Sequence, residues 1–118
     1  MKTNLETIQI TSKNLTKLTF AGDGLIPAII QDDKTKEILM FAFMNLVSLK
    51  KTLKEGKACF WSRSRKKLWV KGESSGNFLF VKSVACDGDC DCLLVKVNPV
   101  GPACHTNEQS CFYRKIKY

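Results

Sequence analysis

The sequence predicts an α+β domain that is rich in β-strands and has one main helix. Two observations lead to this prediction. Most apolar residues fall in short runs separated by polar turns, and only one segment has apolar residues at helical spacing. The 118 residues lie within the usual range for one domain, and we find no repeat, low-complexity segment or linker. We therefore expect residues 1–118 to form a single domain.

The first strands are expected before residue 45. Leu25–Gln31 is apolar and rich in β-branched residues, but it contains Pro27, which favours an edge strand or a bulged strand. A polar turn follows, and the apolar run 37–44 predicts a buried strand.

The one helix is expected over residues 46–55. Asn45 is a suitable N-cap, leucines recur at helical spacing after it, and Gly56 ends the pattern. Most of the remaining chain predicts strands, with turns at 74–76 and 99–102. These strands are expected at 58–63, 67–71, 77–84, 92–97 and 111–116.

The chain is strongly basic, with a net charge of +8 and a pI near 9.3. Such a charge favours anionic partners, either nucleic acid or a small phosphorylated substrate, although a solvated basic surface is an equally plain interpretation. No apolar run approaches the length of a membrane span. The polar residues 1–9 lack the apolar core of a secretory signal, so we expect a cytoplasmic protein with no membrane partner.

Three aspartates alternate with other residues at Asp87, Asp89 and Asp91. On an extended strand these carboxylates would project from one face and repel each other unless a cation joined them. Hard oxygen ligands of this kind suit Mg²⁺. The alternative is an acidic turn exposed to water.

Six cysteines in a chain expected to be cytoplasmic favour metal binding or catalysis over disulfides. Cys86, Cys90 and Cys92 would lie on the strand face opposite the aspartates, and soft thiolates suit Zn²⁺. The alternative is that they pack as small apolar residues, which we favour for Cys92. Cys104 and Cys111 flank the only histidine, His105, whose imidazole is suited to moving protons near neutral pH.

A basic segment precedes these residues. Arg63 and Arg65 would share a strand face and are able to bind phosphate, and the backbone of a small turn at 74–76 offers further donors. The alternative is a hairpin with an exposed basic face. The candidate substrate-binding residues are Arg63, Arg65, Lys71, Ser74, Ser75 and Gly76.

These motifs together resemble those of the phosphoribosyl-AMP cyclohydrolases. The resemblance rests on residues 61–65, 68–69, 71–73 and 75–76, and on Gly101-Pro102-Ala103-Cys104-His105-Thr106 with Ser110-Cys111-Phe112. Residues 24–28, 31–32 and 40–45 are also similar to that family. The likeness extends from about residue 24 to residue 114.

The resemblance implies a compact barrel-like or sandwich-like sheet with one main helix in an intertwined homodimer, with the active site at the interface. It implies hydrolysis of the N1–C6 bond of the adenine ring of phosphoribosyl-AMP in histidine biosynthesis, by zinc-activated water. Carried over by position, Mg²⁺ is held by Asp87, Asp89 and Asp91. Zn²⁺ is held by Cys104 and Cys111, and His105 takes the catalytic position.

The third zinc cysteine of the family falls on Gly88, which has no side chain. We expect Cys90 to replace it, with Cys86 as the alternative, through a bulge or slip of the strand at Gly88. Two other interpretations stay open. One is a cyclohydrolase relative with a decayed zinc site, and the other is a basic zinc-binding module that binds nucleic acid.

Overall fold

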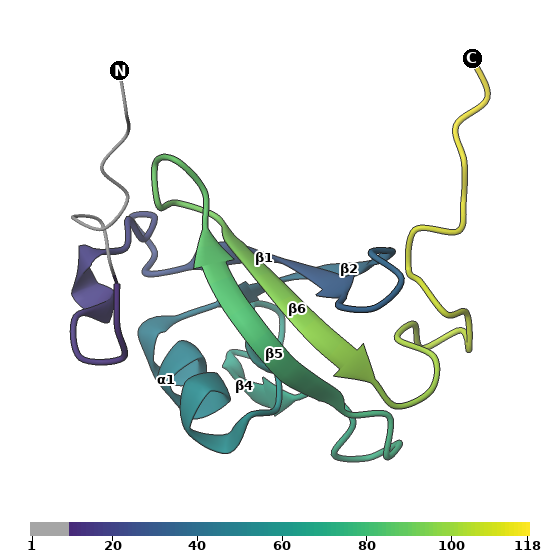
Figure 1. Ribbon diagram of the computed structural model, residues 1–118, viewed down its shortest axis with the longest axis horizontal. Coiled ribbons are helices and arrows are strands. Elements are labelled where there is room, and N and C mark those ends of the chain that lie inside the picture. Colours follow the sequence, from purple (N-terminus) through teal and green to yellow (C-terminus); the bar gives the residue numbers. More distant parts are fainter. Residues whose placement is uncertain (1–9) are drawn as a thin grey trace.

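The computed structural model describes residues 10–118 (Figure 1). The polar segment 1–9, on which the expectation of a cytoplasmic location partly rests, lies outside the described residues. After a short 3₁₀ helix at Leu15–Lys17, the elements follow in chain order: β1 Ile26–Asp32, β2 Ile38–Met44, α1 Leu46–Glu55, β3 Cys59–Ser62, β4 Lys67–Val70, β5 Leu79–Cys86 and β6 Leu93–Pro99. The predicted α+β class, rich in strands and with one main helix, is confirmed.

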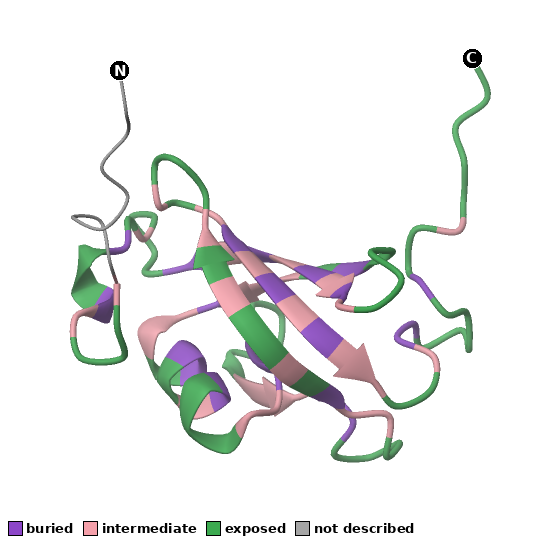
Figure 2. Cartoon of the chain, viewed as in Figure 1, coloured by how far each residue is buried: buried purple, intermediate pink, exposed green. Residues whose placement is uncertain are grey.

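Four strands form one sheet in the order β2-β1-β6-β5, and β3 and β4 form a separate hairpin. Strands β1 and β6 are parallel, whereas the other neighbours are antiparallel. Every second residue is buried throughout β1 and in β6 as far as Val97 (Figure 2). One face of the sheet is therefore buried, and the other is only partly covered.

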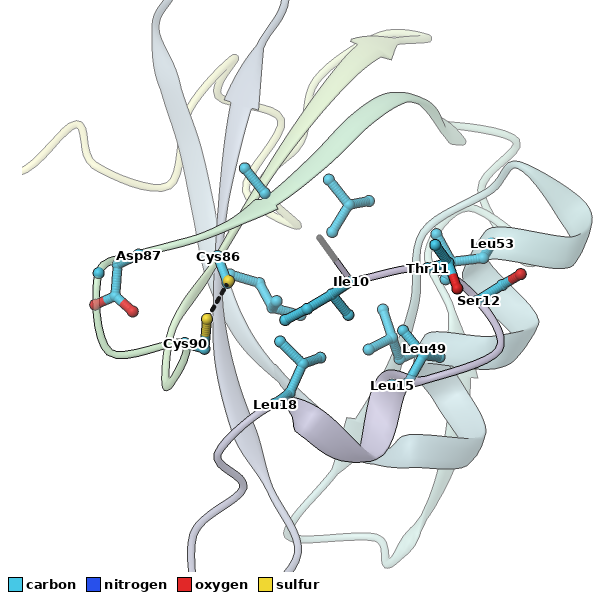
Figure 3. A pocket seen from close by; sticks show the side chains of 14 residues that line it. Ile10, Thr11, Ser12, Leu15, Leu18, Leu49, Leu53, Cys86, Asp87 and Cys90 are labelled. Carbon is cyan, nitrogen blue, oxygen red and sulfur yellow. Dashed lines mark hydrogen bonds between the residues drawn. The ribbon is translucent and has the colours of Figure 1, made fainter. Parts of the chain in front are cut away.

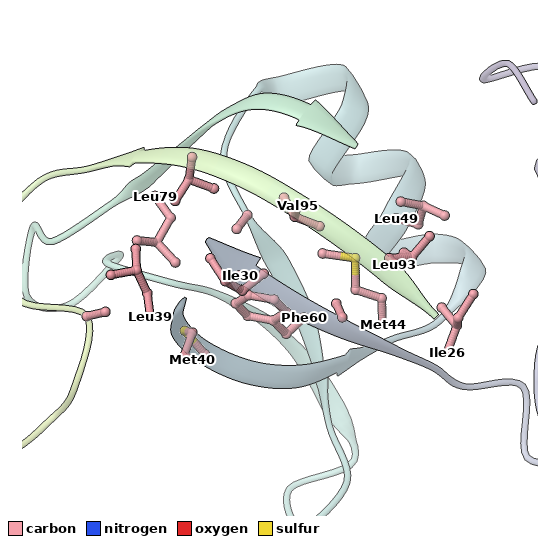
Figure 4. Close-up of a cluster of buried hydrophobic side chains, with 14 of the residues drawn as sticks. Ile26, Ile30, Leu39, Met40, Met44, Leu49, Phe60, Leu79, Leu93 and Val95 are labelled. Carbon is pink, nitrogen blue, oxygen red and sulfur yellow. The ribbon is translucent and has the colours of Figure 1, made fainter. Parts of the chain in front are cut away.

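The buried face supports a single apolar core to which α1 and the β3–β4 hairpin also contribute (Figure 4). Phe60 of β3 is fully buried among side chains of the sheet, and Leu49 of α1 is 1% exposed. This core fixes the hairpin and the helix against the sheet. The loop after β4 and the loop after β6 therefore each begin at a strand that packs against this core.

The helix forms where the sequence predicts it. The Asn45 side chain accepts a hydrogen bond from the Ser48 amide at 2.8 Å, and the Ser48 hydroxyl accepts one from the Asn45 amide at 2.9 Å. At the other end Gly56 adopts a left-handed conformation with φ 73°, which glycine does at little cost. Local side chains therefore define both ends of α1.

Two strand predictions are wrong in part. Strand β1 lies between β2 and β6, so it is an interior strand and not an edge strand. Pro27 is compatible with this position because it precedes Ala28, where the pairing with β6 begins. The predicted irregularity in this strand is present, as a register shift between Ile30 and Gln31. Residues 111–116 form no strand. The Cys111 amide and the Ser110 hydroxyl instead donate to carbonyls of Leu39 and Ile38 in β2.

In residues 10–118, no helix has the length and apolar character needed to cross a membrane.

Candidate functional site

A polar pocket of about 500 Å³ lies beside the β3–β4 hairpin. Its lining includes Arg65, Lys67 and Lys71 with the single acidic residue Glu73, so cations outnumber anions. Pockets of this size accommodate small ligands. Ser74 and Ser75 also line it. The structure therefore brings four of the six predicted substrate-binding residues together around one cavity.

Arg63 and Gly76 have other roles in the structure. Residues 63–66 form the turn between β3 and β4, so the prediction that Arg63 and Arg65 share a strand face is wrong. The Arg63 guanidinium instead stacks over the ring of Phe43 in β2, 4.1 Å from its centre. The Gly76 amide donates to the carbonyl of Gly72 at 2.7 Å, so it is already paired.

The loop after β6 holds Cys104, His105 and Cys111. Hydrogen bonds join the two sides of this loop: the Ala103 amide donates to Gln109 and the Cys104 amide to Glu108. The Cys111 amide donates to the Leu39 carbonyl at 2.7 Å, which ties the loop to β2. His105 is exposed at the tip of this loop. Its side chain is therefore free to face a bound molecule.

The thiols of Cys104 and Cys111 contact each other. Hydrogen bonding by Thr106, whose hydroxyl lies 3.0 Å from the sulfur, lowers the pKa of Cys104. Desolvation, followed by the hydrogen bond with Cys104, raises the pKa of Cys111 to about 11. The positive charge of Lys71 lowers the pKa of both thiols, although it is a minor cause. Lys71 thus lies near the thiol pair as well as in the lining of the polar pocket.

Two glycines allow the loops around this region to pack closely. A Cβ on Gly101 would lie 2.7 Å from the Asn77 side-chain oxygen, and one on Gly72 would lie 2.5 Å from the Phe78 amide nitrogen. The Val100 amide also donates to the Phe78 carbonyl at 2.9 Å. The loop that lines the polar pocket is therefore held against the start of the loop that carries Cys104 and His105.

The three aspartates lie in a tight turn between β5 and β6, so the expected extended strand is wrong here. The turn still gathers the carboxylates. The Asp91 amide donates to a carboxylate oxygen of Asp87 at 3.1 Å. A hydrogen bond with the Asp87 side chain raises the pKa of Asp91. The negative charge of Asp87 raises it further, and that of Asp89 has a smaller effect. A cation would relieve this repulsion, and carboxylate oxygens are donors that Mg²⁺ prefers, although the three side chains do not converge on one point in this arrangement.

The same turn brings Cys86 and Cys90 together at the edge of a second, mainly apolar pocket of about 540 Å³ (Figure 3). Their sulfur atoms are 2.7 Å apart. Desolvation and the hydrogen bond with Cys90 raise the pKa of Cys86 to about 11. The predicted bulge at Gly88 is absent, because Gly88 lies in the turn and not in a strand. Within this turn Cys90 has a positive φ, at 53°. The sulfur of Cys92 lies 3.8 Å from the Leu93 carbonyl oxygen instead.

The two thiol pairs lie at opposite ends of β6. Cys86 pairs with Leu93 at the start of this strand, whereas the loop of Cys104 follows its end at Pro99. Six steps along a strand span about 20 Å. Among residues 10–118, no three His, Cys, Asp or Glu side chains form a group that could hold a metal ion. Cys104 and Cys111 therefore fit zinc as two soft donors that lack a third within the described chain.

Three contributing residues were not among the predicted site residues: Thr106, Phe43 and Asn77. Thr106 lies in the family-like segment 101–106, and its position two residues after Cys104 in a turn, where hydroxyl groups often bond locally, was a further signal. The contacts of Phe43 with Arg63 and of Asn77 with Gly101 join distant parts of the chain. No local pattern reports such contacts.

The comparisons with known proteins agree with one another. The model of the phosphoribosyl-AMP cyclohydrolase family matches residues 40–113. A phosphoribosyl-AMP cyclohydrolase of Chlorobaculum tepidum is 55% identical over 108 residues, which cover 91% of this chain and 79% of the relative. One of Methanococcoides burtonii is 53% identical over 104 residues, covering 88% and 86%. One of Lacticaseibacillus paracasei is 58% identical over 93 residues, covering 79% and 84%.

These relatives define the class of this protein: it is an enzyme, and a hydrolase. This excludes the non-enzymatic nucleic-acid-binding module. The chain belongs to the phosphoribosyl-AMP cyclohydrolase family, which acts in histidine biosynthesis.

Proposed function

We propose that this enzyme hydrolyses the N1–C6 bond of the adenine ring of phosphoribosyl-AMP. The observation that carries the proposal, beyond membership of the family, is a cationic pocket whose Lys71 also acts electrostatically on the thiols of Cys104 and Cys111, the first of which directly precedes His105. A nucleotide that carries phosphate groups needs a cationic pocket to bind it. Opening of its ring needs a source of activated water and a group that moves protons.

The substrate carries a phosphate on each of two ribose groups. Arg65, Lys67 and Lys71 give the pocket the charge needed to bind one of them, and Ser74 and Ser75 add hydroxyl donors. Arg63 lies outside this lining, stacked on Phe43. Its guanidinium is exposed and offers a contact to the second phosphate group.

Two metal ions suit the chemistry of these donor residues. Cys104 and Cys111 would hold zinc with a third donor, Cys90 or Cys86, and Asp87, Asp89 and Asp91 would hold magnesium. When bound, zinc lowers the pKa of a water ligand and so supplies the nucleophile.

His105 is the residue that moves protons. It directly follows Cys104 and is exposed at the tip of its loop. A neutral imidazole in this position takes a proton from the water that attacks C6. It then gives a proton to N1 as the C6–N1 bond breaks.

A second copy of the chain would complete the site. Because the two thiol pairs are separated by the length of β6, a zinc ion bound by both needs them from different chains. The partly covered face of the sheet has an apolar part, beside the polar pair Gln31 and Lys96, that suits such a contact. It carries Pro27, Ile29, Phe41, Phe43 and Leu94, which are aligned across β1, β2 and β6. Phe41 is 47% exposed on this face. These features support a homodimer with a shared zinc site.

A direct assay tests the function. Ring opening of phosphoribosyl-AMP changes the absorbance of the purine, so turnover is followed with and without added Zn²⁺. We expect turnover that a tight zinc chelator abolishes and Zn²⁺ restores. Turnover in metal-free protein would contradict the mechanism. No turnover by folded, zinc-loaded protein would favour the alternative of a decayed site, which the glycine at residue 88 keeps open.

A further inference from the structure

Cys86 and Cys90 form a thiol pair that the family positions do not account for. Their sulfur atoms lie 2.7 Å apart across the base of the β5–β6 turn (Figure 3). This is well inside the distance at which two unbonded sulfur atoms come into van der Waals contact. Little movement therefore separates the pair from a covalent bond, whose length is about 2.05 Å.

The turn holds this arrangement in place. The Cys90 amide donates to the Asp87 carbonyl at 2.9 Å, and the Asp87 amide donates to the Cys92 carbonyl at 3.0 Å. The Cys90 carbonyl accepts a hydrogen bond of 2.8 Å from the Thr19 amide, which ties the turn to the N-terminal segment. Cys90 also has the left-handed backbone conformation, with φ 53°, which few residues of its kind adopt. The backbone therefore orients the two thiols toward each other.

Small reagents have a route to the pair. Both sulfur-bearing residues are only partly buried and line the apolar pocket of about 540 Å³, together with Ile10, Leu15 and Leu18. A cavity of this size admits a low-molecular-weight disulfide. Cys92, in the same turn, does not line this pocket.

We propose that Cys86 and Cys90 are a reversible disulfide site, oxidised by exchange with a low-molecular-weight disulfide. One cysteine thiolate attacks the small disulfide, forms a mixed disulfide and releases one small thiolate. The second cysteine loses its proton and attacks the mixed disulfide at the protein sulfur. This attack releases the second small thiolate and forms the Cys86–Cys90 disulfide bond. Two protein thiols are oxidised and one small disulfide is reduced to two thiols.

The site has a consequence for metal binding, and this part rests on the proposed function. Cys86 and Cys90 are the two candidates for the missing zinc donor, and a disulfide sulfur is no substitute for a thiolate. Oxidation would therefore remove both candidates at once. Cys104 and Cys111, at the other end of β6, would be left as an incomplete donor set.

The test is a cysteine map of the full chain without metal. Reduced protein is incubated at mildly alkaline pH with oxidised glutathione, quenched with acid, alkylated and digested before aspartate residues. Cleavage before Asp87, Asp89 and Asp91 places Cys86, Cys90 and Cys92 on separate peptides. We expect the peptides of Cys86 and Cys90 to be linked, Cys92 to be alkylated, and dithiothreitol to reverse the link. Alkylation of both Cys86 and Cys90, or a link only between Cys104 and Cys111, would overturn the proposal.

Matched variants extend the map. Cys92→Ser should keep the Cys86–Cys90 link, whereas Cys86→Ser should leave Cys90 as a stable mixed disulfide with glutathione. A Cys90–Cys92 link in wild-type protein would overturn the pairing.

The zinc content of the same samples separates this inference from the proposed function. Loss of bound zinc on oxidation, with recovery after reduction, supports both. A Cys86–Cys90 link with zinc retained supports the disulfide site and contradicts these cysteines as zinc donors. If no Cys86–Cys90 link forms and the protein needs Cys90 to bind zinc, the disulfide site is overturned and the proposed function is left intact.

Discussion

Gly88 stands where the family has a zinc-binding cysteine, and its surroundings leave room for one. An added Cβ would have no described heavy atom within 4 Å, and Gly88 is not among the residues with positive φ. Gly88→Cys should therefore fold without strain and place a thiol between Asp87 and Asp89. We expect this variant to bind zinc more tightly than the wild type, measured by competition with a chelating dye. The matched control is Gly22→Cys, at another open position. An equal gain in that control would contradict the assignment.

His105 is expected to move protons without binding metal. His105→Ala should therefore reduce kcat by about 10²–10⁴-fold, the usual range for general acid–base catalysis. Zinc content, measured on the same preparation, should not change. A variant that loses its zinc would show that His105 is a ligand.

At the scale of single residues, the sequence identified the residue types of the site better than their contacts. The thiols, carboxylates and histidine were predicted from their chemistry, and the structure shows Cys104 and Cys111 in contact. The stacking of Arg63 on Phe43 was not predicted, because it joins residues that are twenty positions apart in the chain. Contacts of that kind depend on how strands meet.

At the scale of elements, α1 was predicted with its bounds because its signals are local: a capping box and a left-handed glycine. The segment Asp87–Asp91 alternates like a strand, but its backbone closes a turn through the Cys90–Asp87 hydrogen bond. Residues 111–116 have the apolar character of a strand. The start of this segment is instead held by a hydrogen bond from Ser110 to β2, which lies about seventy positions earlier in the chain.

The buried hydroxyl of Thr52 joins α1 to β3. It donates to the Ser48 carbonyl at 2.8 Å and accepts from the Cys59 amide at 2.9 Å. Thr52→Val should lower the free energy of unfolding by about 1–3 kcal/mol, because the Cys59 amide loses its partner. Thr52→Ser, which keeps the hydroxyl, should lose less. Urea denaturation measures both. Equal losses would mean that packing of the methyl group, and not the hydrogen bond, stabilises this junction.

At the scale of the whole molecule, the partly covered sheet face should pair two chains. Phe41→Glu places a charge in that face, so we expect a folded monomer by light scattering, with unchanged circular dichroism and little bound zinc. Val47→Glu is the matched control, since Val47 is 58% exposed on α1, away from this face. A dimer that survives Phe41→Glu would place the interface elsewhere.

The sharing of one active site between two chains is the central claim, and mixing inactive variants tests it most directly. Asp89→Ala and Cys111→Ser alter opposite ends of β6, and each should be inactive alone. In an equal mixture half of the dimers are mixed, and each mixed dimer regains one intact site, so ring-opening activity should return to about one quarter of wild type. A mixture of Asp89→Ala with Asp91→Ala, which alters the same end, should stay inactive. If the first mixture also stays inactive after subunit exchange has been verified by mass, the shared site is contradicted.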